Sequence, residues 1–240
     1  MVVDGESDQI LVEHNADAER QPASLTKLMT AYLVLGALKR GAVRWDEKVQ
    51  VGASANDAAL VLAERVGGSP AGFEQLMNDT ARQLGMKHTH YATPSGMTTP
   101  GNYSTARDLS TLALRLTKDF PEYYAFSSEQ HFAFGKFEKR NKNWLLGKDP
   151  SVDGMKTGHT QAAGYCIVAT AKRKQTSPPM TRRVFAVLLG APTAGDRITG
   201  AAGLLNYAFS RYEDYPVHDG SGPHVVTRIS QPSGAKSNGT

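Results

Sequence analysis

The stretch PASLTKLMT, residues 22–30, places Ser24 three positions ahead of Lys27 at the start of an apolar run. A serine hydroxyl is a weak nucleophile until a neighbouring group removes its proton. On a helix, residues i and i+3 share a face, so the Lys27 amine can reach that hydroxyl. The flanking leucines and methionine predict burial, which lowers a lysine pKa by disfavouring the ammonium form. The pair is therefore a candidate nucleophile and general base, although serine is also a favoured helix N-cap.

Two further short motifs supply groups that an acyl-transfer site on that serine would need. In the tripeptide SAN, Ser54 would be a hydroxyl proton relay and Asn56 an amide donor for the substrate backbone. In the tripeptide KTG, Lys156 and Thr157 would bind a substrate carboxylate. Gly158 would let an extended substrate lie along the strand edge. Each tripeptide is common alone, but SxxK, SxN and KTG in this order are typical of penicillin-binding proteins and class A β-lactamases.

Hydrophobic periodicity and turn residues predict the elements that carry these motifs. The apolar run after Ser24 indicates a buried helix, and two β-rich segments around KQTSPP indicate a hairpin. A strand followed by helices, then strands and a last helix, predicts an α+β fold. The expected helices cover residues 24–39, 55–66, 70–84, 105–118 and 196–211, and the expected strands cover residues 9–13, 131–138, 164–173 and 182–191.

Length and composition are typical of one folded domain, because 240 residues with 40% hydrophobic content can bury a sizeable core. The net charge of +4 comes from interspersed basic and acidic residues, which argues against a nucleic-acid-binding stripe. Cys166 is the only cysteine, so an intrachain disulfide is excluded. The apolar run at 28–38 is shorter than the about 20 residues of a membrane helix. We expect a catalytic domain over 1–212 and a loose tail over 213–240.

The three motifs, with the strings HNAD, SANDAA, YSTARDL and VDGMKTGHTQAAGY, make residues 3–212 resemble a low-molecular-mass penicillin-binding protein of the D-alanyl-D-alanine carboxypeptidase family. The resemblance implies a β-lactamase/transpeptidase-like fold, an antiparallel sheet flanked by helices with a helical subdomain. It implies acylation of Ser24, with an oxyanion hole formed by the backbone N–H groups of Ser24 and His159. Lys142, in the stretch NKN, would lie near the site. Arg197, in the loop before the last helix, would help hold the terminal carboxylate of D-Ala-D-Ala.

The same resemblance implies a reaction and a place for it. The enzyme would remove the terminal D-alanine from peptidoglycan stem pentapeptides through an acyl-enzyme, and β-lactams would acylate the same serine as substrate mimics. No cofactor is implied, and the histidines lack the i, i+4 spacing of a zinc site. The substrate implies the bacterial periplasm or cell envelope, reached by export, although the sequence starts without an apolar signal region and contains no membrane anchor.

One departure from the family leaves alternatives open. Only 26 residues separate Lys27 from Ser54, whereas the relatives carry a longer segment with extra helices between these motifs. Ser54 must still come within hydrogen-bond distance of the serine–lysine pair. A D,D-endopeptidase acting on peptidoglycan crosslinks would use the same motifs. A catalytically impaired protein that binds penicillin or peptidoglycan peptides would result if the short segment displaced Ser54. A class A β-lactamase is disfavoured because no loop carries a suitable glutamate.

Overall fold

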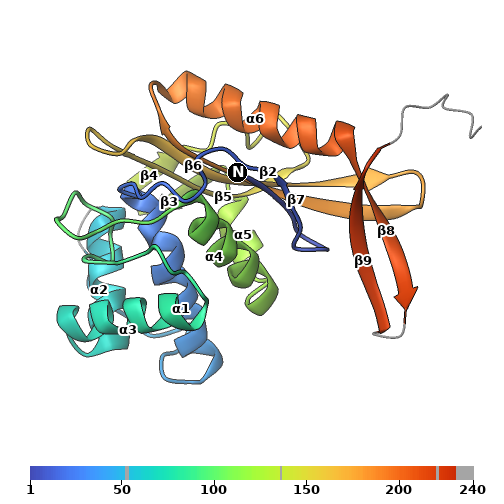
Figure 1. The fold of residues 1–240 in the computed structure, drawn as a ribbon. Helices are drawn as coiled ribbons and strands as arrows, with labels where there is room; N and C mark the ends of the chain where they lie inside the picture. Colours follow the sequence, from blue (N-terminus) through green and yellow to red (C-terminus); the bar gives the residue numbers. More distant parts are fainter. Residues whose placement is uncertain (52–53, 136, 220–221, 231–240) are drawn as a thin grey trace, which may run out of the picture.

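The computed structural model describes residues 1–51, 54–135, 137–219 and 222–230, and its centre is a five-stranded antiparallel sheet (Figure 1). The strand order is β2-β1-β7-β6-β5, so the strand that carries the KTG motif lies at one edge. The α+β fold with an antiparallel sheet and flanking helices is therefore confirmed. The sheet strands are β1 Val2–Asp4, β2 Ile10–Val12, β5 Val152–Thr160, β6 Gly164–Gln175 and β7 Met180–Ala191.

Helices cover both faces of the sheet (Figure 1). The last helix, α6, packs on one face, and the group of helices α1 to α5 lies on the other. None of the helices in the described part of the chain has the length and apolar character needed to cross a bilayer. The helices are η1 Ala23–Thr26 (a single 3₁₀ turn), α1 Lys27–Lys39, α2 Ala55–Gly67, α3 Pro70–Gln83, α4 Ala106–Asp119, α5 Tyr123–Ser127 and α6 Ala194–Arg211.

The sheet separates two hydrophobic cores, because successive side chains of a strand point to opposite faces. On β6, Val168 packs into the core shared with α1 and α4, while its neighbours Ile167 and Ala169 pack into the core under α6. All three side chains are fully buried. This burial on both faces explains why residues 166–169 in the middle of β6 are all apolar and do not alternate with polar ones.

The expected hairpin over 164–173 and 182–191 is confirmed as β6 and β7, each slightly longer than expected. The single strand expected over 131–138 is wrong. This segment forms a two-stranded hairpin, β3 His131–Phe134 and β4 Phe137–Arg140. Gly135 has a φ of +59°, a left-handed conformation that glycine adopts without steric cost, and this turn interrupts the alternating pattern.

The loose tail expected over 213–240 is wrong for the residues that the structure describes. Strands β8 Tyr212–Asp219 and β9 Gly222–Ile229 form a separate hairpin (Figure 1). Asp214, fully buried at its base, lies 3.1 Å from Arg182 of β7, and Arg182 also binds Asp4 of β1 at 3.2 Å. Ion pairs between residues this distant in sequence cannot be found from composition. The last ten residues of the expected tail lie outside the described residues.

Candidate active site

Ser24 does not cap a helix. It lies inside the 3₁₀ turn η1, and the N-cap positions of η1 and α1 belong to Pro22 and Thr26. The expected helix start at Ser24 is therefore corrected: the α-helix begins three residues later, at Lys27. The Ser24 side chain is partly exposed and is left free to contact the lysine amine.

The residue before the nucleophile has an unusual backbone conformation. Ala23 has a φ of +48°, in the left-handed region that costs a non-glycine residue free energy of order 1 kcal/mol. The loop at 93–96 packs tightly against it, because a Cβ on Gly96 would lie only 1.9 Å from the Ala23 carbonyl oxygen. This loop is tied to α1 by a 2.7 Å hydrogen bond from the Thr30 hydroxyl to the Pro94 carbonyl. The surrounding loop therefore holds the turn that presents Ser24.

The Lys27 amine is the centre of the site. It donates hydrogen bonds to the Ser24 hydroxyl at 3.3 Å, to the Asn56 side-chain oxygen at 2.6 Å and to the Ser95 carbonyl at 2.5 Å. Burial, with a smaller contribution from the positive charge of Lys142, lowers the pKa of Lys27 to about 8. At this pKa about one tenth of the amine is neutral at pH 7, far more than for an ordinary lysine.

The three contacts of this amine determine where its lone pair points. The oxygens of Asn56 and Ser95 can only accept hydrogen bonds, so they take the two N–H bonds of a neutral amine. The remaining position, toward Ser24, is then occupied by the lone pair. This arrangement is suited to removing the serine proton.

Asn56 contacts the Lys27 amine, whereas Ser54 forms its hydrogen bonds with Asp57 at the start of α2. The Ser54 hydroxyl accepts a 3.2 Å hydrogen bond from the Asp57 N–H, and the Asp57 carboxylate accepts one from the Ser54 N–H. This capping box begins α2. Asp57 is therefore a negative charge at the helix N-terminus, where it is favourable. No hydrogen bond between Ser54 and the serine–lysine pair occurs within the described residues. A hydroxyl that accepts one hydrogen bond still has its own proton to donate, so a relay role stays a prediction.

The KTG motif lies on β5 directly beside the nucleophile turn. A Cβ on Gly158 would lie 3.0 Å from the Pro22 carbonyl oxygen and 3.1 Å from the Ser24 nitrogen, so only glycine fits without displacement. Thr157 is buried. The Lys156 amine donates a 2.7 Å hydrogen bond to the Thr157 carbonyl. Its pKa is lowered to about 7, mainly by burial and further by the charges of Lys27, Lys142 and Arg197.

Arg197 lies in the first turn of α6 and not in the loop before that helix, so this part of the prediction is corrected. It is only 5% exposed. Its guanidinium donates hydrogen bonds of 3.4 Å to the carbonyls of Gly158 and Lys142, which joins α6 to the edge strand and to the NKN stretch. The Lys142 side chain is exposed, and its charge lowers the pKa values of Lys27 and Lys156. The predicted cations thus converge on one site.

Sequence reasoning missed two contributors to this site. Ser95 acts through its backbone carbonyl, which no residue type signals; the Thr-, Pro- and Gly-rich loop around it was the only indication. Tyr165, at the start of β6, stacks on the exposed ring of His159 with 3.9 Å between ring centroids. Its position just after the turn that follows KTG was the available signal, because hairpin partners face each other.

The arrangement of sheet and helices described above is that of the transpeptidase fold. A mutant form of the Streptomyces K15 DD-transpeptidase shares this fold, with a TM-score of 0.73, 24% identity and coverage of 87% of this chain and 95% of that chain. The model of the D-alanyl-D-alanine carboxypeptidase family, Peptidase S11, matches residues 1–55 and 51–193. The chain belongs to this family. The two matched segments overlap at residues 51–55, at the start of α2.

Curated relatives have the same family name. The chain is 36% identical over 249 residues to D-alanyl-D-alanine carboxypeptidase DacA of Haemophilus influenzae, covering 90% of this chain and 62% of the relative. It is 36% identical over 250 residues to DacC of Escherichia coli, covering 89% and 61%. The chain thus spans about three fifths of the length of these relatives. It is also 31% identical over 206 residues to the D-alanyl-D-alanine endopeptidase of Escherichia coli, covering 70% of this chain and 64% of that protein.

Solved structures extend the likeness to the three-dimensional fold. Penicillin-binding protein 5 of Haemophilus influenzae superposes with a TM-score of 0.87 and 32% identity, covering 95% of this chain and 81% of that chain. Penicillin-binding protein D2 of Listeria monocytogenes, in its cefotaxime-bound form, superposes with a TM-score of 0.78 and 32% identity, covering 87% and 95%.

Proposed function

We propose that this chain is a serine-type D-alanyl-D-alanine carboxypeptidase that removes the terminal D-alanine from peptidoglycan stem pentapeptides. The observation that carries the proposal is the Lys27 amine, which contacts the Ser24 hydroxyl while two acceptors, on Asn56 and Ser95, fix its orientation. Its pKa of about 8 suits a base that works near neutral pH. Family membership and the relatives named carboxypeptidases support the same reaction.

The reaction would proceed through two acyl transfers. The Ser24 oxygen attacks the carbonyl carbon of the penultimate D-alanine while its proton passes to Lys27. Backbone N–H groups of Ser24 and His159 would stabilise the resulting oxyanion, each donor contributing about 3 kcal/mol in the transition state. The C–N bond then breaks, and the leaving nitrogen takes a proton as D-alanine departs. Water then attacks the ester; Lys27 takes one proton from this water and passes it to the Ser24 oxygen as the ester bond breaks, which releases the shortened peptide.

The positive groups around the nucleophile would select a substrate that ends in a carboxylate. Lys156, Thr157 and Arg197 would bind the terminal carboxylate, with the exposed Lys142 nearby. An anion in this site would also raise the lowered pKa of Lys156, because an opposite charge favours the ammonium form. Ser54 and Asn56 would contact the substrate on the other side of the serine.

β-Lactams are the expected inhibitors, because they present a strained amide and a carboxylate to the same groups. Forms of the Listeria penicillin-binding protein D2 with bound cefotaxime and ampicillin support this expectation. The proposed substrate, a peptidoglycan stem peptide, would place the protein in the bacterial periplasm or cell envelope.

Incubation with penicillin followed by intact-mass measurement and peptide mapping tests the proposal. We expect a stoichiometric adduct on Ser24, and release of D-alanine from a pentapeptide. Ser24→Ala should abolish both while leaving the thermal unfolding midpoint nearly unchanged. A folded wild-type protein that forms no adduct and releases no D-alanine would contradict the enzymatic proposal and leave the peptide-binding alternative.

The second candidate is a D,D-endopeptidase, which is favoured by the similarity to the endopeptidase of Escherichia coli. Both activities would use the same acyl-enzyme chemistry. A crosslinked peptide dimer and a pentapeptide, offered at equal concentration, separate them. A kcat/KM that is higher for the dimer would favour the endopeptidase.

A further inference from the structure

Tyr165 lies outside the three motifs, yet it contacts two groups of the candidate site. It is the second residue of β6 and pairs directly with His159 on β5. The two rings are stacked, with centroids 3.9 Å apart and planes inclined by 28°. His159 is the residue that immediately follows KTG, and its backbone N–H is one of the two donors assigned to the oxyanion hole. The tyrosine ring thus packs on the strand segment that carries this donor.

The same ring also faces the guanidinium of Arg197. The central guanidinium carbon lies 5.5 Å from the ring centroid, within the range of a cation–π interaction. The hydrogen bonds of Arg197 to the Gly158 and Lys142 carbonyls are 3.4 Å long, beyond the usual range for N–H to oxygen. Its Nε is buried without a hydrogen-bond partner within the described residues. Hydrogen bonding alone therefore holds this guanidinium weakly, and the ring supplies a further contact.

We propose that Tyr165 is a positioning residue for the proposed reaction: its ring fixes the guanidinium of Arg197 relative to the backbone N–H of His159. This inference rests on the proposed carboxypeptidase function. The two groups would bind opposite ends of the scissile D-Ala-D-Ala unit, the terminal carboxylate and the developing oxyanion. A ring that contacts both would keep their separation constant, so that one substrate can occupy both groups at once.

The chemistry of the contact predicts which part of the tyrosine matters. Both contacts are made by the ring, so Tyr165→Phe should keep KM and kcat for a D-Ala-D-Ala peptide within about twofold. Tyr165→Leu retains bulk but lacks the negative ring face, and KM should rise about 2- to 30-fold, the range of one cation–π interaction. Tyr207→Leu is the matched control, because Tyr207 lies on α6 and contacts the ring of Tyr212 instead. It should leave both constants unchanged.

A double-mutant cycle separates positioning from general structural support. With Arg197→Met already present, adding Tyr165→Leu should raise KM no further, because the cation that the ring holds has been removed. If the KM of the double variant rises by the product of the two single increases, the proposal is overturned. A Tyr165→Phe variant with a KM as high as that of Tyr165→Leu would also overturn it. Thermal unfolding of every variant shows whether it is folded.

If Tyr165→Leu fails to fold, fluorinated phenylalanines at position 165 provide the test with little change in ring shape. Successive fluorine atoms weaken the negative ring face, so KM should increase with each substitution; a constant KM would overturn the proposal. Wild-type protein that releases no D-alanine would overturn the proposed function together with this inference. Wild-type release combined with unaffected Tyr165 variants would overturn the positioning role alone.

Discussion

The Lys27 amine lies 2.6 Å from the side-chain oxygen of Asn56, although the two residues belong to different helices and are 29 positions apart. This contact joins the first and second motifs across the connection between α1 and α2. The loop between α1 and α2 is therefore long enough to bring Asn56 to the base. The remaining question about the second motif concerns Ser54, whose hydroxyl caps α2.

Ser54→Ala separates the capping role of this hydroxyl from its predicted relay role. Loss of the cap should lower the free energy of unfolding by about 1 kcal/mol. Loss of a proton relay should also slow penicillin acylation about 100-fold or more. Ser69→Ala is the matched control, because Ser69 caps α3 in the same way. Stopped-flow acylation and urea unfolding measure the two effects. Equal acylation rates in Ser54→Ala and Ser69→Ala would mean that Ser54 only caps its helix and relays no proton.

Lys142→Met should move the pH–rate profile to higher pH. The proposed reaction needs a neutral Lys27, formed as pH rises through about 8, and a charged Lys156, lost as pH rises through about 7. Their opposing requirements give kcat/KM a bell shape with its maximum between these values. The charge of Lys142 lowers both pKa values, so its removal raises both. Profiles of kcat/KM should shift for Lys142→Met and remain in place for Lys148→Met, an exposed lysine on the same segment.

Gly158→Ala should damage the site more than the fold. The added methyl group would lie about 3 Å from Pro22, Ala23 and Ser24, so β5 must move away from the nucleophile turn. Overpacking of this kind costs about 1–3 kcal/mol of stability. Displacement of an oxyanion donor should slow acylation about 100-fold or more. Gly203→Ala on α6, where a Cβ meets nothing within 4 Å, should instead stabilise the protein by about 0.5–1 kcal/mol and retain full activity. Comparable acylation rates for both variants would contradict the close approach.

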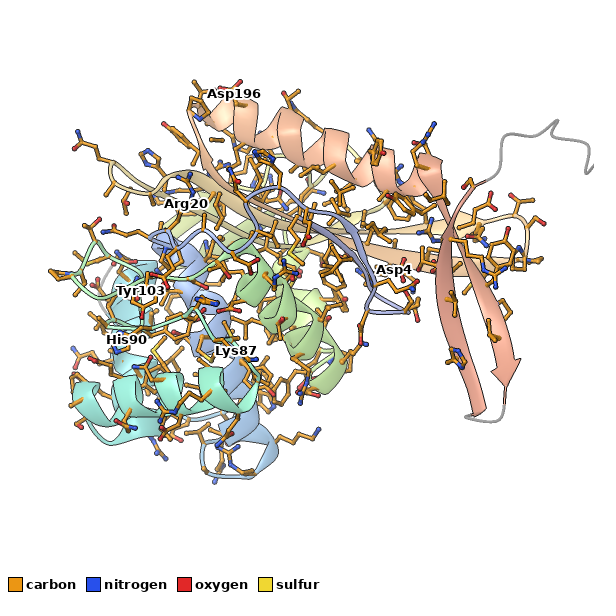
Figure 2. The ribbon with its side chains drawn as sticks, in the orientation of Figure 1. Asp4, Arg20, Lys87, His90, Tyr103 and Asp196 are labelled. Atoms are coloured by element: carbon orange, nitrogen blue, oxygen red, sulfur yellow. The ribbon has the colours of Figure 1, made fainter. Side chains whose placement is uncertain are left out.

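Asp214 should make the stability of the protein fall as pH rises from about 4 to 6. Burial, followed by the nearby negative charge of Asp4, raises its pKa to about 6, although Thr227 and Arg182 oppose the shift. Between the unfolded pKa of about 3.8 and the folded value, the folded protein holds more of the proton, so rising pH removes stability. Figure 2 shows Asp4 beside the β8–β9 hairpin and Asp196 at the opposite end of α6.

The measurement is urea unfolding at several pH values for the wild type and Asp214→Asn. The difference between the two proteins isolates this carboxyl from others, such as Asp149, whose pKa values are lowered. As pH rises from about 4 to 6, the free energy of unfolding of Asp214→Asn should increase relative to that of the wild type. Parallel curves would mean that Asp214 titrates normally. Because the group lies far from the site, penicillin acylation should be unchanged.

The sequence alone supplied the proposed chemistry and the long helices. The order of SxxK, SxN and KTG indicated Ser24, Lys27 and Lys156 as candidates, because a nucleophile, a base and an anion-binding group must be particular residue types. Apolar periodicity located the long helices α1 to α4 and α6 and the β6–β7 hairpin, since these depend on local spacing, but it did not predict α5, β1 or the KTG strand β5. The predicted features are encoded within short segments and need no information about distant contacts.

Tertiary structure decided what depends on contacts between distant residues. The Ser95 carbonyl orients Lys27 through backbone that no residue type signals. Arg197 reaches the site from a helix on the other face of the sheet, and the β8–β9 hairpin is attached through Asp214 to Arg182 and Asp4. The lowered pKa values of Lys27 and Lys156 arise from burial and from like charges that folding brings together. A sequence pattern specifies which groups are available, but their distances and desolvation exist only once the chain has folded.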